Sequence, residues 1–251
     1  MEGFGRLPEE CISEIMSYTS ALDASRSSIL SKEFRSAASN DVVWDRFLPP
    51  DYEDIVSASV SPVTYDTKKQ LYLSLCDYPI LINGGKMSFC LDKRNGKKCV
   101  MVGARQLLIS WKSCWDFTPH SNSRFSEVAE LRSIGWVHIE GKTTTEMLSK
   151  DTEYAAYLVF WVGRMDGLKS SNTVIRFRKG KSKIDTMNER FESRETGKLA
   201  KMRGDGWMEI ELGKFYNDDS DDGEVEAWFT QISSPIGMSG LVVEGVEFRP
   251  L

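Results

Sequence analysis

Residues 107–142 combine three short strand patterns with a polar loop, and this combination constrains the fold more than any other part of the chain. Residues 107–111 and 128–131 are apolar runs, and residues 134–142 alternate between apolar and polar side chains, which is typical of strands. The loop between the first two runs is rich in Ser, Asn and Pro and has aromatic residues near its start. Loops that hold large aromatic residues on a β scaffold often form binding surfaces. The stretch therefore predicts a β fold with an aromatic binding loop.

Short strand patterns continue from residue 80 to residue 251. Asn95-Gly96 separates apolar runs at residues 88–92 and 98–102 and predicts a hairpin, because both residues tolerate the positive φ of a tight turn. Residues 154–163 are apolar on both faces, as expected for a central buried strand. Further strands are expected at residues 173–178, 207–212, 225–232 and 241–248, and the polar residues 182–201 are expected to form a loop.

This succession of short strands and turns predicts an all-β antiparallel sandwich of jelly-roll type over residues 80–251. The two sheets of such a fold bury alternate side chains between them. We expect four large side chains in this core: Trp136, Leu158, Phe160 and Ile210.

Residues 1–49 have a different, helical pattern. Pro8 is followed by two acidic residues, which favours a helix start, and Ile12, Ile15 and Met16 form one apolar stripe. Later helices are expected to begin at Ser20 and at Asn40 or Asp41, and to end at Pro49-Pro50. A small all-α unit of this length buries little surface, so some of its apolar residues should be exposed and available to a partner.

Residues 50–79 read as a helical connector between these two parts. A short helix is expected near residues 52–59, and Pro62 interrupts it. Asp66 can cap a second helix that runs to about Cys76, with Leu71 and Leu75 on one face. The chain is therefore expected to be multidomain, with a helical domain, a connector and a β domain.

Composition argues against several classes of protein. The chain is 41% apolar and 27% charged, as in ordinary globular proteins, and no apolar run approaches the ~20 residues of a membrane helix. The N-terminus lacks the basic and apolar regions of a secretory signal. Five widely spaced cysteines without a C-x-x-C pair predict free thiols in the cytoplasm or nucleus. The net charge of −5 argues against nucleic acid as the main ligand.

The residue order of the helical part resembles the F-box motif. The matching positions, within about residues 4–49, are Leu7-Pro8, Ile12, Ile15, Asp23, Ser31-Lys32, Phe34-Arg35, Val43-Trp44 and Phe47-Leu48-Pro49. An F-box docks on Skp1 and through it on a cullin, so the resemblance implies a Skp1-like partner. The residues expected to contact it are Leu7, Pro8, Ile12, Ile15, Leu30 and Trp44.

The β part resembles the phloem protein 2 lectins, of which the tobacco leaf lectin is a relative. The matching blocks are residues 109–111, 115, 127–131, 136–142, 154–160, 203–210, 222–226, 240–245 and 249–250. Proteins of the phloem protein 2 family occur fused to an F-box. Together the two parts look like a plant F-box protein of the phloem protein 2 B type.

The lectin resemblance assigns a sugar-binding role to Trp111 and Trp115. In the lectin relatives, tryptophans of this segment are proposed to contact glycans that contain N-acetylglucosamine, and indole faces pack well on the C–H faces of pyranose rings. The alternative is that either ring is part of the core. The chain departs from the family in two places: only residues 112–114 separate the two tryptophans, and residues 237–240 lack a tryptophan that many members have.

Other candidate chemistry in the sequence has a simpler interpretation. His120 and His138 are at no metal-ligand spacing. The acidic run 218–223 lacks the final glutamate of a calcium loop, and the basic run 176–183 fits a solvated strand and turn better than an RNA site. Alternating acids on two strands could serve a glycosidase only if they flanked one cleft: Glu209, Glu211, Glu224 and Glu226. No catalytic residue, metal or cofactor is therefore expected.

The resemblance implies a substrate-recognition adaptor of an SCF (Skp1-cullin-F-box) ubiquitin ligase that performs no covalent chemistry itself. Residues 1–49 would bind the Skp1-like protein, and residues 80–251 would bind a glycan or glycoprotein target. The alternative is a carbohydrate-binding stress-response lectin that does not act in degradation. A small glycoside hydrolase is a third, disfavoured reading.

Overall fold

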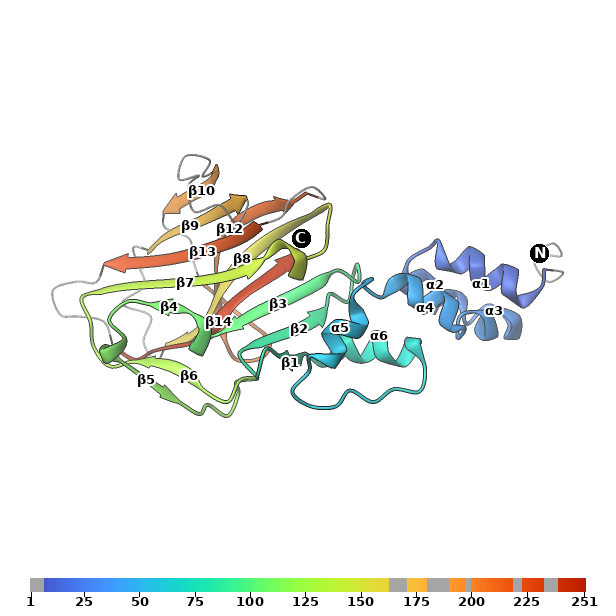
Figure 1. The fold of residues 1–251 in the computed structure, drawn as a ribbon, viewed down its shortest axis with the longest axis horizontal. Helices are drawn as coiled ribbons and strands as arrows, with labels where there is room; N and C mark the ends of the chain where they lie inside the picture. The colour runs from blue at the N-terminus through green and yellow to red at the C-terminus, as the bar shows by residue number, and fades with distance from the viewer. Residues whose placement is uncertain (1–6, 163–170, 180–189, 197–199, 219–222, 233–238) are drawn as a thin grey trace. The chain divides into compact units, whose positions relative to one another are not determined.

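The computed structural model describes residues 7–162, 171–179, 190–196, 200–218, 223–232 and 239–251. The chain divides into two compact units (Figure 1). The first consists of residues 1–80 and 89–98, and the second of residues 81–88 and 99–251.

The described part of the first unit contains six helices: α1 (Glu9–Ser17), α2 (Ala21–Ser27), α3 (Lys32–Ala37), α4 (Asp41–Phe47), α5 (Tyr52–Ser57) and α6 (Lys68–Asp77). Four of them begin at a polar side chain that accepts a hydrogen bond from a first-turn N–H, which satisfies a backbone donor that the helix leaves free. These caps are Ser20, Ser31, Asn40 and Thr67. The predicted caps Ser20 and Asn40 are confirmed. The expected cap Asp66 is wrong by one residue, since Asp66 N instead donates to Gln70 Oε1 at 2.8 Å.

Trp44 of α4 lies at the centre of this helical unit. Its side chain is fully buried, its Nε1 donates to Ala38 O at 2.8 Å, and its ring centroid lies 5.3 Å from that of Tyr72 in α6. A buried indole needs such a partner for its N–H. The contact shows that the second connector helix packs against the last helix of the first fifty residues.

The tip of the hairpin formed by β2 (Met87–Leu91) and β3 (Lys98–Gly103) also belongs to the helical unit. Lys98 Nζ donates to Asp51 Oδ2 at 2.6 Å. Gly96 has a φ of +68°, and a Cβ there would lie 2.6 Å from the Tyr72 hydroxyl. Glycine is therefore required at this turn for both its conformation and its small size.

The second unit is built from two sheets of antiparallel strands. The larger sheet holds β1 (Ile80–Ile82), β2, β3, β5 (Trp115–Thr118), β6 (Val128–Leu131), β8 (Thr152–Val162), β11 (Lys201–Met202), β12 (Met208–Asn217) and β14 (Leu241–Pro250). The smaller sheet runs in the order β10 (Arg190–Thr196), β9 (Ser171–Lys179), β13 (Gly223–Ile232), β7 (Trp136–Thr144) and β4 (Leu108–Ile109). The predicted antiparallel sandwich after a helical region is confirmed.

The two sheets pack face to face through their alternating apolar side chains. At Gly141 of β7, an added Cβ would lie 2.6 Å from the Cβ of Val246 in β14, so the sheets approach closely there. Leu158, Phe160 and Ile210 are buried as predicted. Their burial follows from the period-two alternation of strands that have one face on the core.

Two expectations for this unit are wrong. Trp136 is not in the core: its side chain is 40% exposed, because it shares a face with His138 and Glu140 while Val137 and Ile139 point inward. The expected loop at residues 182–201 contains β10, which pairs with β9. A polar sequence is compatible with a strand at a sheet edge, and residues 182–189 and 197–199 lie outside the described part.

Candidate binding surfaces

The helical unit exposes several large apolar side chains. They come from the start of the chain, from α1, from α2 and from the turn that follows α2: Leu7, Ile15, Tyr18, Leu22, Ile29 and Leu30. Large exposed apolar side chains gathered on one small unit are typical of protein interaction sites. We call these residues the apolar patch.

The six residues predicted to contact a Skp1-like protein divide into two groups. Leu7, Pro8, Ile15 and Leu30 are exposed. Ile12 and Trp44 are buried within the unit, so as direct surface contacts they are corrected here. Their apolar character is explained by the core that they form, and the sequence pattern alone does not separate the two groups because α1 is apolar on more than its inner face.

The outer face of the smaller sheet carries a row of aromatic and charged side chains, which we call the aromatic strip. Its members are Trp136, His138, Glu140 and Lys142 of β7 and Glu226, Trp228 and Thr230 of β13. These positions alternate with the core-facing residues of the same strands, so their side chains point away from the larger sheet.

His138 connects the aromatic members of the strip. Its ring stacks on Trp136 with centroids 5.9 Å apart and lies edge-on to Trp228, also at 5.9 Å. Its Nδ1 is 3.1 Å from Thr230 Oγ1. His138 therefore orients both indole rings.

The charged members of the strip are paired with one another. Lys142 Nζ lies 3.0 Å from Glu140 Oε1 and 2.6 Å from Glu226 Oε1. Burial disfavours the charged form of Glu140, but hydrogen bonds and charge from His138 and Lys142 outweigh this and lower its pKa. The carboxylate of Glu140 is therefore ionised and can accept hydrogen bonds on the face that carries the indole rings.

Trp111 lies at the edge of the same sheet. It follows Ser110, whose N donates to His138 O at 3.1 Å and whose Oγ accepts from His138 N at 3.2 Å. Trp111 has a φ of +55° and its side chain is 64% exposed. A bulky residue in the left-handed region is strained, and the indole is exposed at this edge of the sheet.

Trp115 is buried, whereas a ring that binds a sugar must have an exposed face. Its side chain is only 5% exposed, and its Nε1 donates to Ser110 O at 3.2 Å. A buried ring has no open face for a sugar, so the assignment of Trp115 as a direct contact is corrected here. The prediction for Trp111 stays a prediction.

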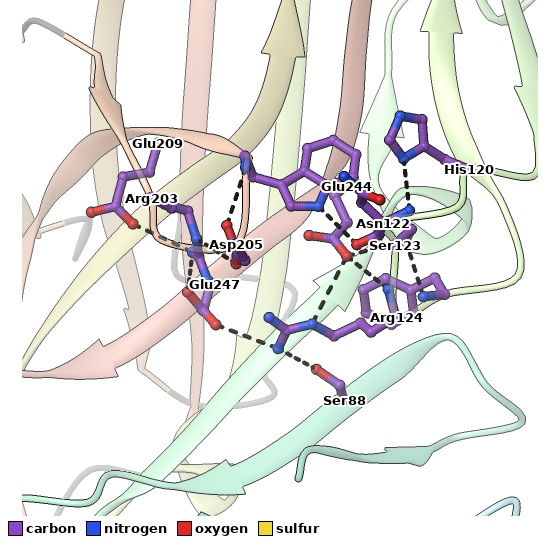
Figure 2. Close-up of polar contacts among 12 residues, drawn as sticks. Ser88, His120, Asn122, Ser123, Arg124, Arg203, Asp205, Glu209, Glu244 and Glu247 are labelled. Atoms are coloured by element: carbon purple, nitrogen blue, oxygen red, sulfur yellow. Dashed lines mark hydrogen bonds and ion pairs between the residues drawn. The ribbon is translucent and has the colours of Figure 1, made fainter. Parts of the chain in front are cut away.

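A cluster of charged residues on the other face of the larger sheet is structural (Figure 2). Glu244 of β14 is buried, and its Oε1 accepts from Ser123 Oγ at 3.1 Å and from Arg124 N at 3.0 Å. Arg124 also lies 3.6 Å from Glu247, which accepts from Arg203 at 2.7 Å. Burial raises the pKa of Glu244 although Arg124 opposes this effect.

This charged cluster holds the segment before β6 over the sheet. Trp207 Nε1 donates to Asn122 O at 3.0 Å, and the Trp207 and His120 rings lie 4.9 Å apart. The segment covers an apolar cluster on this face of the larger sheet. The cluster is made of Met101, Phe125, Val128, Val159, Trp207 and Val242. The central strand β8 is therefore buried on both faces at Val159, as its sequence indicates.

The alternating acids do not form a glycosidase pair. Glu209 lies on the larger sheet and accepts hydrogen bonds from Arg203 and Arg249. Glu226 lies on the smaller sheet in the aromatic strip and pairs with Lys142. Both point away from the core between the sheets, so the two pairs do not flank one cleft as glycoside hydrolysis requires.

A membrane-spanning helix, a metal site and the charged runs of the sequence remain to be considered. Within the residues described, no helix has the length and apolar character to cross a membrane, and no three His, Cys, Asp or Glu side chains form a metal-binding group. Residues 180–183 of the basic run, 219–222 of the acidic run and 237–238 before β14 lie outside the described residues.

The positions of Trp136 and Trp228 in the aromatic strip were not predicted from the sequence. The signal for Trp136 was present, because the alternation of residues 134–142 places it on the same face as His138. No sequence pattern indicated that Trp228 would meet them, since β13 and β7 are about ninety residues apart and their register is set by the folded sheet.

Comparison with known proteins identifies the family. The F-box domain matches residues 4–46 and the phloem protein 2 family matches residues 97–250. An F-box protein of Arabidopsis thaliana is 42% identical over 267 residues, which cover 98% of this chain and 80% of the relative. The Arabidopsis thaliana F-box protein PP2-B10 is 37% identical over 258 residues, covering 98% of this chain and 94% of the relative.

Likeness to solved structures is weak. The N-terminal modules of a Clostridium thermocellum endo-1,4-β-D-xylanase complexed with xylohexaose match 59% of this chain and 27% of the xylanase chain, with 12% identity and a TM-score of 0.35. The chain belongs to the plant F-box proteins of the phloem protein 2 B type, with an F-box domain followed by a phloem protein 2 domain.

Proposed function

We propose that this protein is the substrate-recognition adaptor of an SCF-type ubiquitin ligase. The observation that carries the proposal is the apolar patch on a unit that matches the F-box domain. A Skp1-like protein that covers this patch would remove apolar surface from water, which is the main driving force of association. The cullin would bind through the Skp1-like protein.

The adaptor acts by raising effective concentration and not by covalent catalysis. One end binds the ligase and the other binds the target, so the lysines of the target stay near the ubiquitin-conjugating enzyme.

For the phloem protein 2 domain we propose a glycan or glycoprotein ligand that binds at Trp111 and the aromatic strip. Exposed indole faces supply apolar contact with sugar rings, and Glu140 and Lys142 supply hydrogen bonds for hydroxyl groups. Among these residues Trp111 and Trp136 have exposed indole rings, so these two are the residues expected to touch the sugar.

The ligase arm is tested by co-purification with a recombinant Skp1-like protein. Replacing Leu7 and Pro8 together by Ala should weaken binding by ~2 kcal/mol or more, because interface energy concentrates in a few central residues. Leu73→Ala is the matched control, since Leu73 is also exposed but lies on α6, outside the F-box. Unchanged binding by the double variant would overturn the proposed interface.

The glycan arm is tested by retention on chitooligosaccharide and N-glycan resins. Trp136→Ala should abolish retention with little change in melting temperature, whereas Trp161→Ala should leave retention unchanged. Trp161 is the matched control because it is similarly exposed but lies on β8 of the larger sheet. Equal retention of both variants would remove the strip as the sugar site.

The second candidate function is a carbohydrate-binding stress-response lectin that does not act in degradation. The exposed indoles of Trp111 and Trp136 are compatible with it, and the apolar patch is not explained by it. Glycan retention without co-purification of any Skp1-like protein would favour this second function.

For either function we propose a cytoplasmic or nuclear location. The thiols of Cys11, Cys76 and Cys114 are free in the described part of the chain, as expected in a reducing compartment. Fluorescence microscopy of the tagged full chain tests this, and a secreted or vacuolar signal would contradict it.

A further inference from the structure

A cavity of about 370 Å³ lies in the second unit, where the end of β3 meets the turn between β1 and β2. Three segments of the chain form its walls: residues 84–86 of this turn, residues 103–105 at the end of β3, and residues 125–127 before β6. We call this cavity the glycine pocket, because Gly84, Gly85 and Gly103 line it. It shares no residue with the aromatic strip.

Hydrogen bonds hold the first two walls together. Gly103 N donates to Lys86 O at 2.9 Å. Asn83 Nδ2 donates to Gln106 Oε1 at 3.1 Å, which joins the turn to the short 3-10 helix η2 (Ala104–Gln106) after β3. The turn is therefore tied to the end of β3 by both backbone and side-chain bonds, and these two walls are formed without a ligand.

The third wall is held by the charged cluster beside it. Phe125 N donates to Ser123 Oγ at 3.0 Å, and Ser123 Oγ donates to Oε1 of the buried Glu244 at 3.1 Å. A Cβ at Gly103 would lie 2.9 Å from the ring of Phe125, so this buried ring packs directly on the backbone of β3. The pocket therefore has an apolar wall with a fixed position.

The turn contributes backbone groups to the pocket. Gly84 and Gly85 have φ values of +62° and +80°, which favour glycine, and a residue without a side chain can line a cavity only with its backbone. Gly85 N donates to Ile82 O at 3.1 Å, whereas Gly84 N has no hydrogen-bond partner among the described residues. Free N–H groups in such turns are donors for anions.

The charged side chains of the pocket leave one positive charge uncompensated. Arg105 Nε and Nη2 donate to the Glu127 carboxylate at 2.7 and 2.8 Å. This bond lowers the pKa of Glu127, so the carboxylate is ionised and balances Arg105. Lys86 is exposed and forms no ion pair with another described residue. A ligand with one negative charge therefore fits the pocket better than a neutral ligand, and better than a doubly charged one that Glu127 would repel.

The size and lining of the pocket favour a carboxylate that is attached to a carbon chain. Its volume of about 370 Å³ is far larger than the ~30 Å³ of one water molecule. Ala104 and Phe125 offer apolar surface for methylene groups, whereas the Lys86 ammonium and Gly84 N are donors for a carboxylate. A glutamate or aspartate side chain combines these two features.

We infer that the glycine pocket binds the carboxylate of an acidic residue in a partner polypeptide. In the proposed adaptor this partner would be the target protein, recognised through its protein chain. The inference does not depend on the proposed glycan binding, because the pocket shares no residue with Trp111 or the aromatic strip. Two separate contacts with one target would raise the overall affinity above that of either contact.

The test is NMR titration of the isotope-labelled full chain with a capped alanine-glutamate-alanine tripeptide and its glutamine counterpart. The glutamate peptide should shift the amide signals of Gly84, Gly85 and Gly103 saturably and bind about fivefold or more tightly than the glutamine peptide, because a hydrogen bond to a charged group is the stronger one. Lys86→Gln should remove this difference. Lys214→Gln is the matched control, since Lys214 is also exposed and without an ion pair among the described residues but lies on β12.

Ser126→Trp tests the cavity itself. Ser126 is exposed and lines the pocket, so the indole should fill the space and abolish the shifts at an unchanged melting temperature. Shifts that persist in this variant would contradict binding inside the cavity.

Butyrate and methyl phosphate separate the possible sources of the anion. Butyrate that binds as tightly as the glutamate peptide would assign the pocket to a small free acid and overturn the peptide ligand. Tighter binding of methyl phosphate would overturn the charge argument. Equal responses of these wild-type amide signals to the glutamate and glutamine peptides would overturn the inference, whatever the retention of the protein on a glycan resin.

Discussion

Ile12 and Ile15 of α1 offer a direct test of how the helical unit divides its apolar residues between core and interface. They are the same residue type on the same helix, yet Ile12 is 3% exposed and Ile15 is 49% exposed. Substituting each by Ala removes the same atoms from two different environments. The two variants therefore control for each other.

The magnitudes follow from burial. At Ile12 about three buried carbons at ~0.8 kcal/mol each give ~2.4 kcal/mol, and the cavity left behind brings the loss of unfolding free energy to ~2–5 kcal/mol. At Ile15 about half of this surface is already in water, so the loss is ~1 kcal/mol. The better helix propensity of Ala offsets part of that loss, by a few tenths of a kcal/mol.

Binding should show the opposite order. If a Skp1-like protein covers Ile15, Ile15→Ala should cost ~1.4 kcal/mol or more, which is about tenfold in Kd. Denaturant unfolding and calorimetric titration with the Skp1-like protein measure the two effects. A large loss of stability in Ile15→Ala with unchanged Kd would refute the assignment of this residue to the interface.

Three further predictions concern the sandwich. Phe160→Ala should lower the unfolding free energy by ~3–5 kcal/mol because Phe160 is fully buried between the sheets, and a loss below 1 kcal/mol in denaturant unfolding would contradict its place there. Trp115→Ala should lower the melting temperature strongly, because it removes a buried ring and the hydrogen bond from Trp115 Nε1 to Ser110 O. An unchanged melting temperature would contradict the burial of Trp115. Glu244 has a raised pKa because of burial, so its neutral form stabilises the fold at low pH and this contribution is lost as pH rises through the raised pKa. The stability of Glu244→Gln relative to wild type should therefore increase from about pH 4 to about pH 7, and a difference that is constant or falls in thermal melts would contradict the direction of the shift.

Much of this fold could be predicted from local patterns. The helix caps at Ser20 and Asn40 and the alternation of residues 134–142 are short-range signals, and the structure follows them. The hairpin at Asn95-Gly96 follows in the same way, with Gly96 alone adopting a positive φ. These features depend on residues a few positions apart, so a single sequence contains the information.

The candidate site could be predicted only in part, because its surroundings come from distant strands. Trp111 and Trp115 are near neighbours in sequence, yet the left-handed backbone at Trp111 turns one ring outward while the other packs inward. Trp228 joins Trp136 through the register of β13 with β7. Periodicity does not fix either feature, since backbone strain and strand pairing are properties of the folded domain.

The edge strand β10 was missed for a related reason. Its sequence, from Arg190 to Thr196, is polar and lacks the apolar alternation that marks a strand. Pairing with β9 satisfies its backbone groups whatever its side chains are. Propensity is therefore a weak guide at a sheet edge.

The central claim is that one chain joins a ligase component to a glycan, and a single bridging measurement tests it. A recombinant Skp1-like protein is passed over a chitooligosaccharide resin alone, with wild type, with Trp136→Ala and with the Leu7 and Pro8 double variant. We expect the resin to retain the Skp1-like protein only with wild type, whereas the double variant should be retained on the resin without the Skp1-like protein. Wild type retained on the resin with the Skp1-like protein in the flow-through would contradict the adaptor function.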